Sequence, residues 1–458
     1  MNRRLLQEME RWLGNERRKP LVLRGARQVG KTWAVRDLAR RSKLELVELN
    51  FEEHPEYAEL FKQTSPTTIL SELERLFAQR ISPSSTLLFL DEVQRAPEAF
   101  AELRWFYEKM PEMPVVATGS LLDFVLADHS FSMPVGRISY LFMEPMSFEE
   151  FLEALGEDQL LSYLSTIDLQ PPSAAVHEKL LRLFRDYTII GGMPDAILEW
   201  IETRSLLAVA EIHQNLNRTY REDFNKYPTR LDLTAVEKVM NAIPRLLGQK
   251  FKYSNVDRES RSAPLKRSLE MLSMARVCHI VRHSPGNGVP LAAEENPRNF
   301  KVISSDVGLA SSMQGLLLET NSEIERLIRV NAGGIAEQAV GQGLRCLAQP
   351  FVDSVLHYFS REKQGSEAEL DYLLEVGTRV IPLEVKAGAT GSLKSLHHFM
   401  KQRQLPLAVR VNADPASLTP LSVKLNTGES VEYTLLSIPF YLVGQVRRLI
   451  REAENLAT

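Results

Sequence analysis

A glycine-rich stretch near the N-terminus constrains the fold more than any other part of this 458-residue sequence. Residues 21–32 read LVLRGARQVGKT, which is a short apolar run followed by the spacing Gly25-x-x-x-x-Gly30-Lys31-Thr32. Glycines let successive backbone N–H groups curl around an anion, and the N-terminus of a following helix adds partial positive charge. The pattern predicts a phosphate-binding loop between a buried strand and a helix that starts near Trp33.

The loop residues have predicted tasks in holding ATP and Mg²⁺. Lys31 is expected to reach the β- and γ-phosphates, and the Thr32 hydroxyl is expected to ligate Mg²⁺. The alternative is a glycine-rich turn that binds nothing, which the strand–loop–helix context disfavours. The predicted nucleotide-binding residues of the loop are Gly25, Ala26, Arg27, Gln28, Val29, Gly30, Lys31 and Thr32.

A second apolar run, Thr86–Leu90, ends in the acidic pair Asp91-Glu92. About sixty residues after a phosphate-binding loop, such a run is typical of a buried parallel strand that ends at the nucleotide. Asp91 is predicted to hold Mg²⁺, directly or through water, and Glu92 to polarise the attacking water as a general base. The alternative is an ordinary strand that ends in charged residues.

Two further positions are candidates for contact with the γ-phosphate. The strand-like run Pro114–Ser120 offers Thr118 and Ser120, although Ser120 could instead cap a following helix. Arg137 precedes the apolar run Ile138–Met143 and is predicted to act as an arginine finger on a neighbouring subunit's nucleotide. A solvated or structural arginine is the alternative.

The segments RGARQVGKT, LLFLDEVQ, ATGS and GRISYLFMEPMSFEEF together resemble a prokaryotic AAA-type ATPase family whose C-terminal region is labelled a domain of unknown function. Further segments that fit are YTIIGGMP at residues 187–194, FKVISSDVGL at 300–309, IAE at 335–337, ELD at 369–371 and EVK at 384–386. The resemblance implies an ATP-binding three-layer α/β/α core. It also implies that Gly191, Gly192 and Pro194 form a lid turn near the nucleotide.

Residues 251–325 follow a winged-helix plan after a mostly helical stretch. We expect a short helix at Asn255–Glu259, a helix at Pro264–Ala275, a strand at Arg276–His283 and a hairpin turn at Ser284–Val289. Basic side chains on and before the second helix could meet DNA phosphates. They are Arg258, Arg261, Lys266 and Arg267. The alternative is a solvated face of a protein-contacting domain, because Glu259 and Glu270 dilute the charge.

The last part of the chain carries carboxylates on two expected strands and a helix. Asp371 lies in one strand, Glu384 and Lys386 share a face of the next, and Glu337 lies on a helix. The arrangement resembles restriction-endonuclease-like nucleases, which implies that Glu337, Asp371 and Glu384 hold Mg²⁺ while Lys386 assists catalysis. Leu370 stands where the family pattern has proline. The alternative is a salt-bridged fold that does not cleave.

The predicted fold class is therefore α/β, with a three-layer α/β/α P-loop core, a helical and winged-helix region, and a restriction-endonuclease-like C-terminal domain. The predicted boundaries are 1–145 for the ATP-binding domain, 146–250 for a helical lid or linker, 251–325 for the winged helix, 326–412 for the nuclease-like domain and 413–458 for an extension. The expected function is ATP hydrolysis that controls a region acting on nucleic acid. A non-cleaving switch that gates protein assembly is the alternative.

Composition excludes several other classes. Only Cys278 and Cys346 are present, far apart, which disfavours a disulfide framework or a zinc site and suits the cytoplasm. The charged N-terminal residues do not form a signal peptide, and no run of about 20 apolar residues predicts a membrane span. A net charge of −4 neither favours nor excludes DNA. A homo-oligomer or a protein partner is expected alongside ATP.

Overall fold

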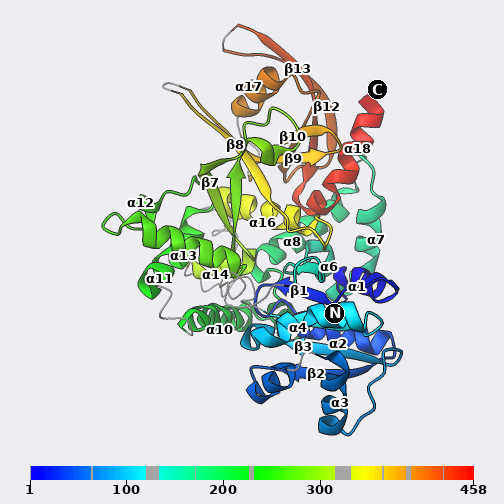
Figure 1. Ribbon diagram of the computed structural model, residues 1–458. Coiled ribbons are helices and arrows are strands. Elements are labelled where there is room, and N and C mark those ends of the chain that lie inside the picture. The colour runs from blue at the N-terminus through cyan, green and yellow to red at the C-terminus, as the bar shows by residue number, and fades with distance from the viewer. Residues whose placement is uncertain are drawn as a thin grey trace. The chain divides into compact units, whose positions relative to one another are not determined.

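The computed structural model describes residues 2–62, 65–119, 134–170, 172–225, 232–314, 332–363, 366–387, 393–426 and 428–457 (Figure 1). The chain forms two compact units. The first comprises Met1–Glu144 together with two short segments, Met274–Val277 and Ala348–Asp353. The second comprises Pro145–Ser273, Cys278–Leu347 and Ser354–Thr458.

The first unit is built on a five-stranded sheet in the order β2-β3-β4-β1-β5, and every described pairing in it is parallel. Its strands are β1 (Leu21–Gly25), β2 (Glu45–Asn50), β3 (Thr86–Asp91), β4 (Val115–Thr118) and β5 (Ser139–Met143). β1, β3, β4 and β5 lie within apolar runs of the sequence, whereas β2, with the sequence ELVELN, alternates polar and apolar residues. A parallel sheet has its faces covered, and this explains why nearly continuous apolar runs form the strands.

Helices cover both faces of this sheet. They are α1 (Leu5–Leu13), α2 (Lys31–Arg41), α3 (Pro66–Phe77) and α4 (Pro97–Lys109), with short 3₁₀ turns η1 (Pro55–Lys62) and η2 (Val93–Arg95). Val22, Leu88 and Leu90 share one core cluster with side chains of α3 and α4. The alternate residues, such as Leu87 and Phe89, are equally buried on the other face. The predicted three-layer α/β/α arrangement of this unit is confirmed.

The strand order brings the functional loops together. Because β1 lies between β4 and β5, and β4 lies next to β3, the carboxyl ends of β1, β3 and β4 meet at one edge of the sheet. In a parallel sheet this edge is where ligands bind. It carries Gly25 at the end of β1, Asp91 at the end of β3 and Thr118 at the end of β4.

The second unit begins with helices. They are α6 (Phe148–Ala154), α7 (Asp158–Thr166), α8 (Ala174–Ile190), α9 (Pro194–Thr203), α10 (Leu206–Asn225) and α11 (Leu233–Ala242), followed by η3 (Pro244–Leu246). Ser147 caps α6 by accepting a hydrogen bond from the Glu150 amide, and the Glu150 carboxylate accepts one from the Ser147 amide. This is the reciprocal capping box that the spacing of these two residues allows.

An eight-stranded sheet forms the rest of the second unit, in the order β12-β13-β11-β10-β9-β8-β6-β7. Its strands are β6 (Cys278–His283), β7 (Asn296–Ser304), β8 (Leu356–Lys363), β9 (Ser366–Val376), β10 (Arg379–Val385), β11 (Leu407–Asn412), β12 (Ser417–Lys424) and β13 (Ser430–Pro439). The other helices and 3₁₀ turns of this unit are α12 (Tyr253–Val256), α13 (Ser262–Met274), η4 (Leu291–Glu294), α14 (Val307–Met313), α16 (Ala332–Cys346), α17 (Lys394–Arg403), η5 (Phe440–Gln445) and α18 (Val446–Ala457).

The predicted winged-helix elements occur in the expected order as α12, α13, β6 and β7. β6 and β7 pair as an antiparallel hairpin, as expected, but the connection is longer than Ser284–Val289 because it runs on through η4 before β7 starts. β6 also pairs in parallel with β8, so this hairpin continues the sheet that carries Asp371 and Glu384. The same sheet includes β12 and β13 from the expected extension. The domain boundaries stay predictions, and one sheet runs across two of them.

Two local expectations are corrected by the backbone. The apolar residues Ile69, Leu70, Leu73, Leu76 and Phe77 predict a helix over Pro66–Arg80. Helix α3 ends earlier, at Phe77, because Ala78 adopts a left-handed conformation. Pro439 predicts an edge strand or a bend. The edge strand is wrong, because β13 lies between β12 and β11, but Pro439 does close β13 and the chain continues into η5. Within the ranges that the structure describes, no helix combines the length and apolar character needed to cross a membrane.

Candidate active site

The phosphate-binding loop connects β1 directly to α2. Gly30 precedes α2 in a left-handed conformation with φ of 97°, and Gln28 is also left-handed, with φ of 62°. A Cβ atom on Gly25 would lie 2.5 Å from the Met143 carbonyl oxygen of the neighbouring strand β5. The first glycine is thus required by close backbone packing, and the second by the turn into the helix.

Lys31 folds back over its own loop. Its Nζ donates hydrogen bonds to the Gly25 and Ala26 carbonyl oxygens, at 3.0 and 2.8 Å, and the side chain is buried. Burial lowers the pKa of Lys31 to about 8, although the nearby charges of Glu92 and Asp91 act in the opposite direction. These backbone contacts hold the ammonium beside the loop, where a phosphate could take their place.

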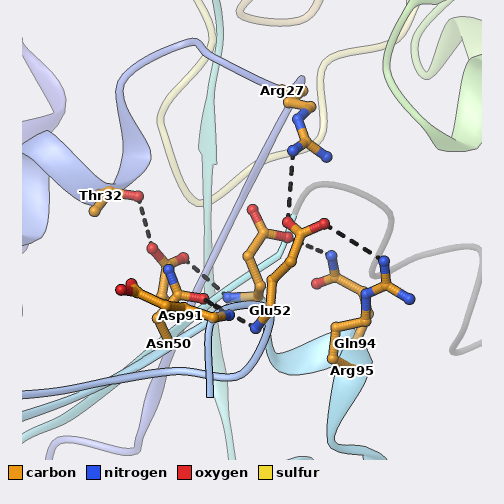
Figure 2. A network of polar contacts seen from close by, with 9 residues as sticks. Arg27, Thr32, Asn50, Glu52, Asp91, Gln94 and Arg95 are labelled. Carbon is orange, nitrogen blue, oxygen red and sulfur yellow. Dashed lines mark hydrogen bonds and ion pairs between the residues drawn. The ribbon is translucent and has the colours of Figure 1, made fainter. Parts of the chain in front are cut away.

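The two predicted Mg²⁺ ligands face each other across the sheet edge (Figure 2). The Thr32 hydroxyl donates a hydrogen bond of 2.8 Å to Asp91 Oδ2. Asp91 Oδ1 accepts hydrogen bonds from the Thr118 hydroxyl and from the Glu92 amide, the latter at 2.9 Å. Thr118 therefore reaches the site through Asp91, and the Asp91 carboxylate is held by three donors.

Glu92 sits at the turn after β3 with an unusual backbone. Its φ of 52° is left-handed, which a residue with a Cβ rarely adopts. The Gln94 side-chain amide donates a hydrogen bond to Glu92 Oε2. Such strain at a predicted general base is consistent with a functional position.

A polar network surrounds this edge in Figure 2. Glu52 lies between two arginines, with Arg27 Nη2 at 3.5 Å and Arg95 Nη2 at 3.4 Å. The Asn50 side chain accepts a hydrogen bond of 2.9 Å from the Glu52 amide. Arg27, predicted to bind the nucleotide, is therefore tied to the turn after β2.

Two buried arginines that the sequence did not single out support this unit, Arg3 at the loop and Arg276 beside β5. Arg3 donates hydrogen bonds to the Val29 and Glu144 carbonyl oxygens, at 2.7 and 2.6 Å. Arg276 lies over the Phe142 ring, 2.8 Å from Asp353 and 3.6 Å from Glu144. Their partners are distant in sequence, so no local pattern could have indicated either role.

The remaining candidate residues of the first unit make no described contact with the residues of the phosphate-binding loop. The exposed Arg137 guanidinium contacts Glu108 on α4 at 3.1 Å and the Val135 carbonyl oxygen at 3.3 Å. A role as an arginine finger in another subunit stays a prediction. Ser120 lies outside the described residues.

The residues present fit ATP with Mg²⁺. The loop backbone leaves no room for a side chain at Gly25, the lysine ammonium rests on carbonyl oxygens, and a hydroxyl and a carboxylate converge at 2.8 Å. Hydroxyl and carboxylate oxygens are the ligands that Mg²⁺ prefers, and an ammonium complements phosphate.

The predicted nuclease-like residues also come together, in the second unit, around a lysine that the sequence analysis missed. Lys301 Nζ on β7 lies 2.9 Å from Glu337 Oε1, 2.6 Å from Glu369 Oε1 and 3.6 Å from Asp371 Oδ1. Lys386 Nζ lies 2.5 Å from Glu384 Oε1. The available signal was a lysine inside the apolar run FKVIS, since lysine is rarely buried without a partner.

Burial and charge shift the proton equilibria of this cluster. Burial raises the pKa of Glu337 to about 8, against the lowering effect of Lys301. Burial raises the pKa of Glu384 to about 7, and the Asp371 charge adds to that. Burial alone would lower the pKa of Lys301, but the charges of Glu337, Asp371 and Glu369 outweigh it and raise that pKa. Among the described residues, no three His, Cys, Asp or Glu side chains are placed to hold a metal ion.

The double-glycine turn expected as a lid is anchored by Asp306 in the same unit. The Gly192 amide donates a hydrogen bond of 2.6 Å to Asp306 Oδ2. Gly191 has φ of +76°, and a Cβ there would lie 2.1 Å from Asp306 Oδ1. The turn therefore exists, and its role as a nucleotide lid stays a prediction.

Family models match three parts of the chain. Residues 17–152 match a model described as AAA domain, residues 181–320 match a domain of unknown function (DUF8612), and residues 332–421 match a domain of unknown function (DUF4143). No curated protein matches the chain. With the loop geometry above, the first match shows that the N-terminal region is a P-loop ATPase domain of the AAA type.

Solved structures with some similarity include the Walker-type ATPase PABY2304 of Pyrococcus abyssi, at 16% identity and a TM-score of 0.43, covering 68% of this chain and 94% of that one. The Aeropyrum pernix ORC2 protein, in ADPNP–ADP complexes, has 12% identity and a TM-score of 0.36, with 72% and 93% covered. PCH-2 of C. elegans has 14% identity and a TM-score of 0.27, with 45% and 67% covered. At these TM-scores the similarity supports no further conclusion about this chain.

Proposed function

We propose that this chain hydrolyses ATP with the help of Mg²⁺ and works as a switch in which the nucleotide state controls the C-terminal region. The observation that carries the ATPase part is the contact of 2.8 Å between the Thr32 hydroxyl and Asp91, beside the buried Lys31 ammonium. A hydroxyl, a carboxylate and an ammonium at the edge of a parallel sheet are the groups that ATP hydrolysis needs.

Each group has a distinct task in this mechanism. When bound, Mg²⁺ neutralises charge on the β- and γ-phosphates. Lys31 exchanges its bonds to the Gly25 and Ala26 carbonyl oxygens for phosphate oxygens. Asp91, oriented by Thr118, holds the metal side of the site, and Glu92 accepts a proton from the attacking water.

Steady-state ATP turnover tests this proposal. Lys31→Ala should abolish nucleotide binding, whereas Glu92→Gln should retain binding and lower kcat by about 10²–10⁴-fold, which is typical of a lost general base. Glu53→Gln is the matched control, because Glu53 is an exposed carboxylate on the neighbouring turn after β2. Unchanged turnover in Glu92→Gln would refute the role of Glu92.

We also propose that Arg137 contacts the nucleotide of a neighbouring subunit. This role requires a homo-oligomer. Mixing Lys31→Ala protein with Arg137→Ala protein tests it, since each mixed interface can pair an intact P-loop with an intact Arg137. Recovery of turnover in the mixture supports action between subunits. An impaired Arg137→Ala protein that the mixture does not rescue would refute action between subunits, and an Arg137→Ala rate equal to wild type would leave Arg137 only its contact with Glu108.

A nucleic-acid-contacting role for the C-terminal region is the second candidate. It is favoured by the exposure of four basic side chains, Arg258, Arg261, Lys266 and Arg267, on and before α13. The opposing observation is that Lys266 lies 3.8 Å from Glu270 on the same helix. The rival is a switch that gates protein assembly through the same surface.

Salt dependence of DNA binding separates these two candidates. If the four side chains contact phosphates, replacing all of them with glutamine should reduce the slope of log K against log salt by about 3–4. Lys401→Gln on α17 is a control for the loss of a single charge. Absence of DNA binding at low salt, with ATP turnover intact, would favour protein assembly.

Nucleic-acid cleavage is a separate question, and the resemblance to nucleases implies Asp371, Glu384 and Lys386 as the residues on which it would depend. Asp371 and Glu384 belong to the paired strands β9 and β10, and Lys386 contacts Glu384. Plasmid and single-stranded DNA with Mg²⁺ or Mn²⁺ test it in wild type, Asp371→Asn and Lys31→Ala. Cleavage lost in Asp371→Asn would establish a metal-dependent nuclease.

A further inference from the structure

Lys301 occupies the centre of the carboxylate cluster in the second unit. The residue lies on β7, whereas the carboxylates come from α16 and β9, so tertiary packing alone brings them together. Its side chain is only 1% exposed, and its Nζ lies within 3.6 Å of Glu337, Glu369 and Asp371. A lysine buried to this extent requires ion pairs to offset the loss of its hydration.

Most of the carboxylate oxygens that would bind a divalent cation already have partners. Glu337 Oε1 and Asp371 Oδ1 face Lys301, and Asp371 Oδ2 accepts a hydrogen bond of 2.8 Å from the Val385 amide. Glu384 Oε1 is paired with Lys386. Glu384 Oε2 is buried without a hydrogen-bond partner among the described residues. The oxygens that remain do not make a Mg²⁺ site while the Lys301 ammonium lies among them, because Mg²⁺ is held through one or two carboxylates in near-ideal octahedral geometry.

An ammonium and a divalent cation compete for the same place. Both are attracted by the same carboxylates, and they repel each other strongly at the separation of two groups bound to one oxygen. Lys301 has the advantage of being covalently attached, so it pays no entropy of association. It also has little freedom to withdraw, because its aliphatic part is buried and its Nζ lies 5.4 Å from the centre of the Tyr358 ring.

We propose that the Lys301 ammonium takes the place of a divalent cation in this cluster, so that the C-terminal domain does not cleave nucleic acid. The residues implied by the resemblance to nucleases are present, but they do not fit a metal while Lys301 lies among them. The cluster acts instead as a permanent ion-pair core that ties β7 to α16 and β9. This inference is independent of ATP hydrolysis in the first unit.

Binding of Mn²⁺ alone, counted by electron paramagnetic resonance without nucleotide, tests the proposal. All proteins are full-length and carry Asp91→Asn, which removes a predicted cation ligand at the P-loop. The parent should show no Mn²⁺ that depends on Asp371. Lys301→Met should gain one Mn²⁺ per chain, bound at least about tenfold more tightly than by the parent, and adding Asp371→Asn should remove it again.

Lys386→Met is the matched control, because it removes the other lysine of the cluster while Lys301 remains. It should gain no Mn²⁺. If Lys301→Met does not fold, the double variant Lys301→Met/Glu369→Gln removes one charge of each sign, with Glu369 the most exposed of the three carboxylates, and should still gain the ion. Asp371-dependent Mn²⁺ binding in the parent would overturn the proposal, and so would an equal gain in Lys386→Met.

Discussion

Close backbone packing leaves no room for a side chain at Gly25, and a substitution by alanine tests this. A Cβ at Gly25 would lie 2.5 Å from the Met143 carbonyl oxygen, a backbone atom that cannot rotate away. Gly25→Ala should therefore push β1 from β5 and lower the free energy of unfolding by about 1–3 kcal/mol, as overpacking does. ATP affinity should fall as well, since the loop starts at this residue. Chemical denaturation and nucleotide titration measure the two effects.

Gly14→Ala is the matched control within the same unit. The nearest atom to a Cβ at Gly14 lies 3.6 Å away, and the backbone there has φ of −74°. Its stability should change by less than about 1 kcal/mol, with alanine slightly favoured. Equal losses in both variants would show that Gly25 is sensitive for a reason other than the contact with Met143.

At the same scale, the sequence could indicate residues whose partners are local or whose spacing is stereotyped. Lys31, Thr32 and Asp91 were predicted because the loop pattern and a strand ending in an acid fix their positions. Arg3, Arg276 and Lys301 were not, because each acquires its partners only through tertiary packing. For Lys301, the apolar neighbours in the sequence indicated burial, but no local pattern could identify the three carboxylates that pair with its ammonium group.

At the scale of elements, Asp306 joins the double-glycine turn to α14. Its fully buried carboxylate accepts hydrogen bonds from the Leu309 and Gly192 amides and from Gln342. Asp306→Ala would leave these donors without an acceptor, so the free energy of unfolding should fall by about 3–5 kcal/mol. Urea denaturation, monitored by tryptophan fluorescence, measures it.

Asp232→Ala provides the comparison for a simple helix cap. The exposed Asp232 at the start of α11 accepts one side-chain hydrogen bond, from the Ala235 amide at 3.1 Å. Its loss should cost about 1 kcal/mol, as N-cap removal does. Similar costs in the two variants would mean that Asp306 acts only as a cap and does not secure the turn.

Helix α8 contains a carboxylate whose ionisation opposes folding. Burial raises the pKa of Asp186 to about 6, although Arg182, Arg204 and Arg185 lower it. A carboxyl with a raised folded pKa binds its proton more tightly in the native state, so its penalty is absent below about pH 4 and complete above about pH 6. Asp186→Asn should therefore stabilise the protein by about 1–2 kcal/mol at pH 7.5, after allowing for solvent screening.

Denaturation curves at several pH values check this prediction. The gain in Asp186→Asn should shrink as the pH falls from 6 toward 4. Asp158→Asn, in the exposed first turn of α7, should show no such gain and is the control. A gain that persists unchanged at pH 4 would mean that the amide helps by packing and not by removing a charge.

Helices and strands could be predicted where one short stretch of sequence contains the whole pattern. The apolar strand that ends at Asp91 was predicted with its type and approximate bounds. The hairpin after β6 was predicted, but not its length, because glycine and proline signal a reversal without fixing how far the chain travels before β7. Strand pairing could not be predicted either, because β6 pairs with β8, which lies more than seventy residues away in the sequence.

At the scale of the whole molecule, the domain boundary predicted between residues 325 and 326 does not coincide with a break in the sheet. The expected winged-helix hairpin, the carboxylate-bearing strands and the last strands form one eight-stranded sheet. A disturbance of β6 or β7 can therefore reach Lys301 through continuous backbone pairing. If ATP binding shifts one strand of this sheet, the strands paired with it can carry that shift to the others.

Hydrogen exchange with a non-hydrolysable ATP analogue tests whether such a signal exists. Binding itself should slow exchange in peptides covering residues 21–32 and 86–92, which hold the loop and Asp91. A switch demands more than this: peptides covering residues 253–273, which belong to the second unit, should also change, and Lys31→Ala should remove both effects. Changes confined to the first unit would refute control by nucleotide while leaving ATP binding intact.

Reciprocity makes the same switch testable from the other side. If the nucleotide changes the affinity of the C-terminal region for DNA or a protein by some factor, that ligand must change ATP affinity by the same factor. Typical coupling of about 1–3 kcal/mol corresponds to about a 5–150-fold effect, which nucleotide titrations with and without the ligand would resolve. Charge-removed variants at Arg258, Arg261, Lys266 and Arg267 should lose the ligand's effect on ATP yet retain ATP affinity, since none lies in the P-loop unit.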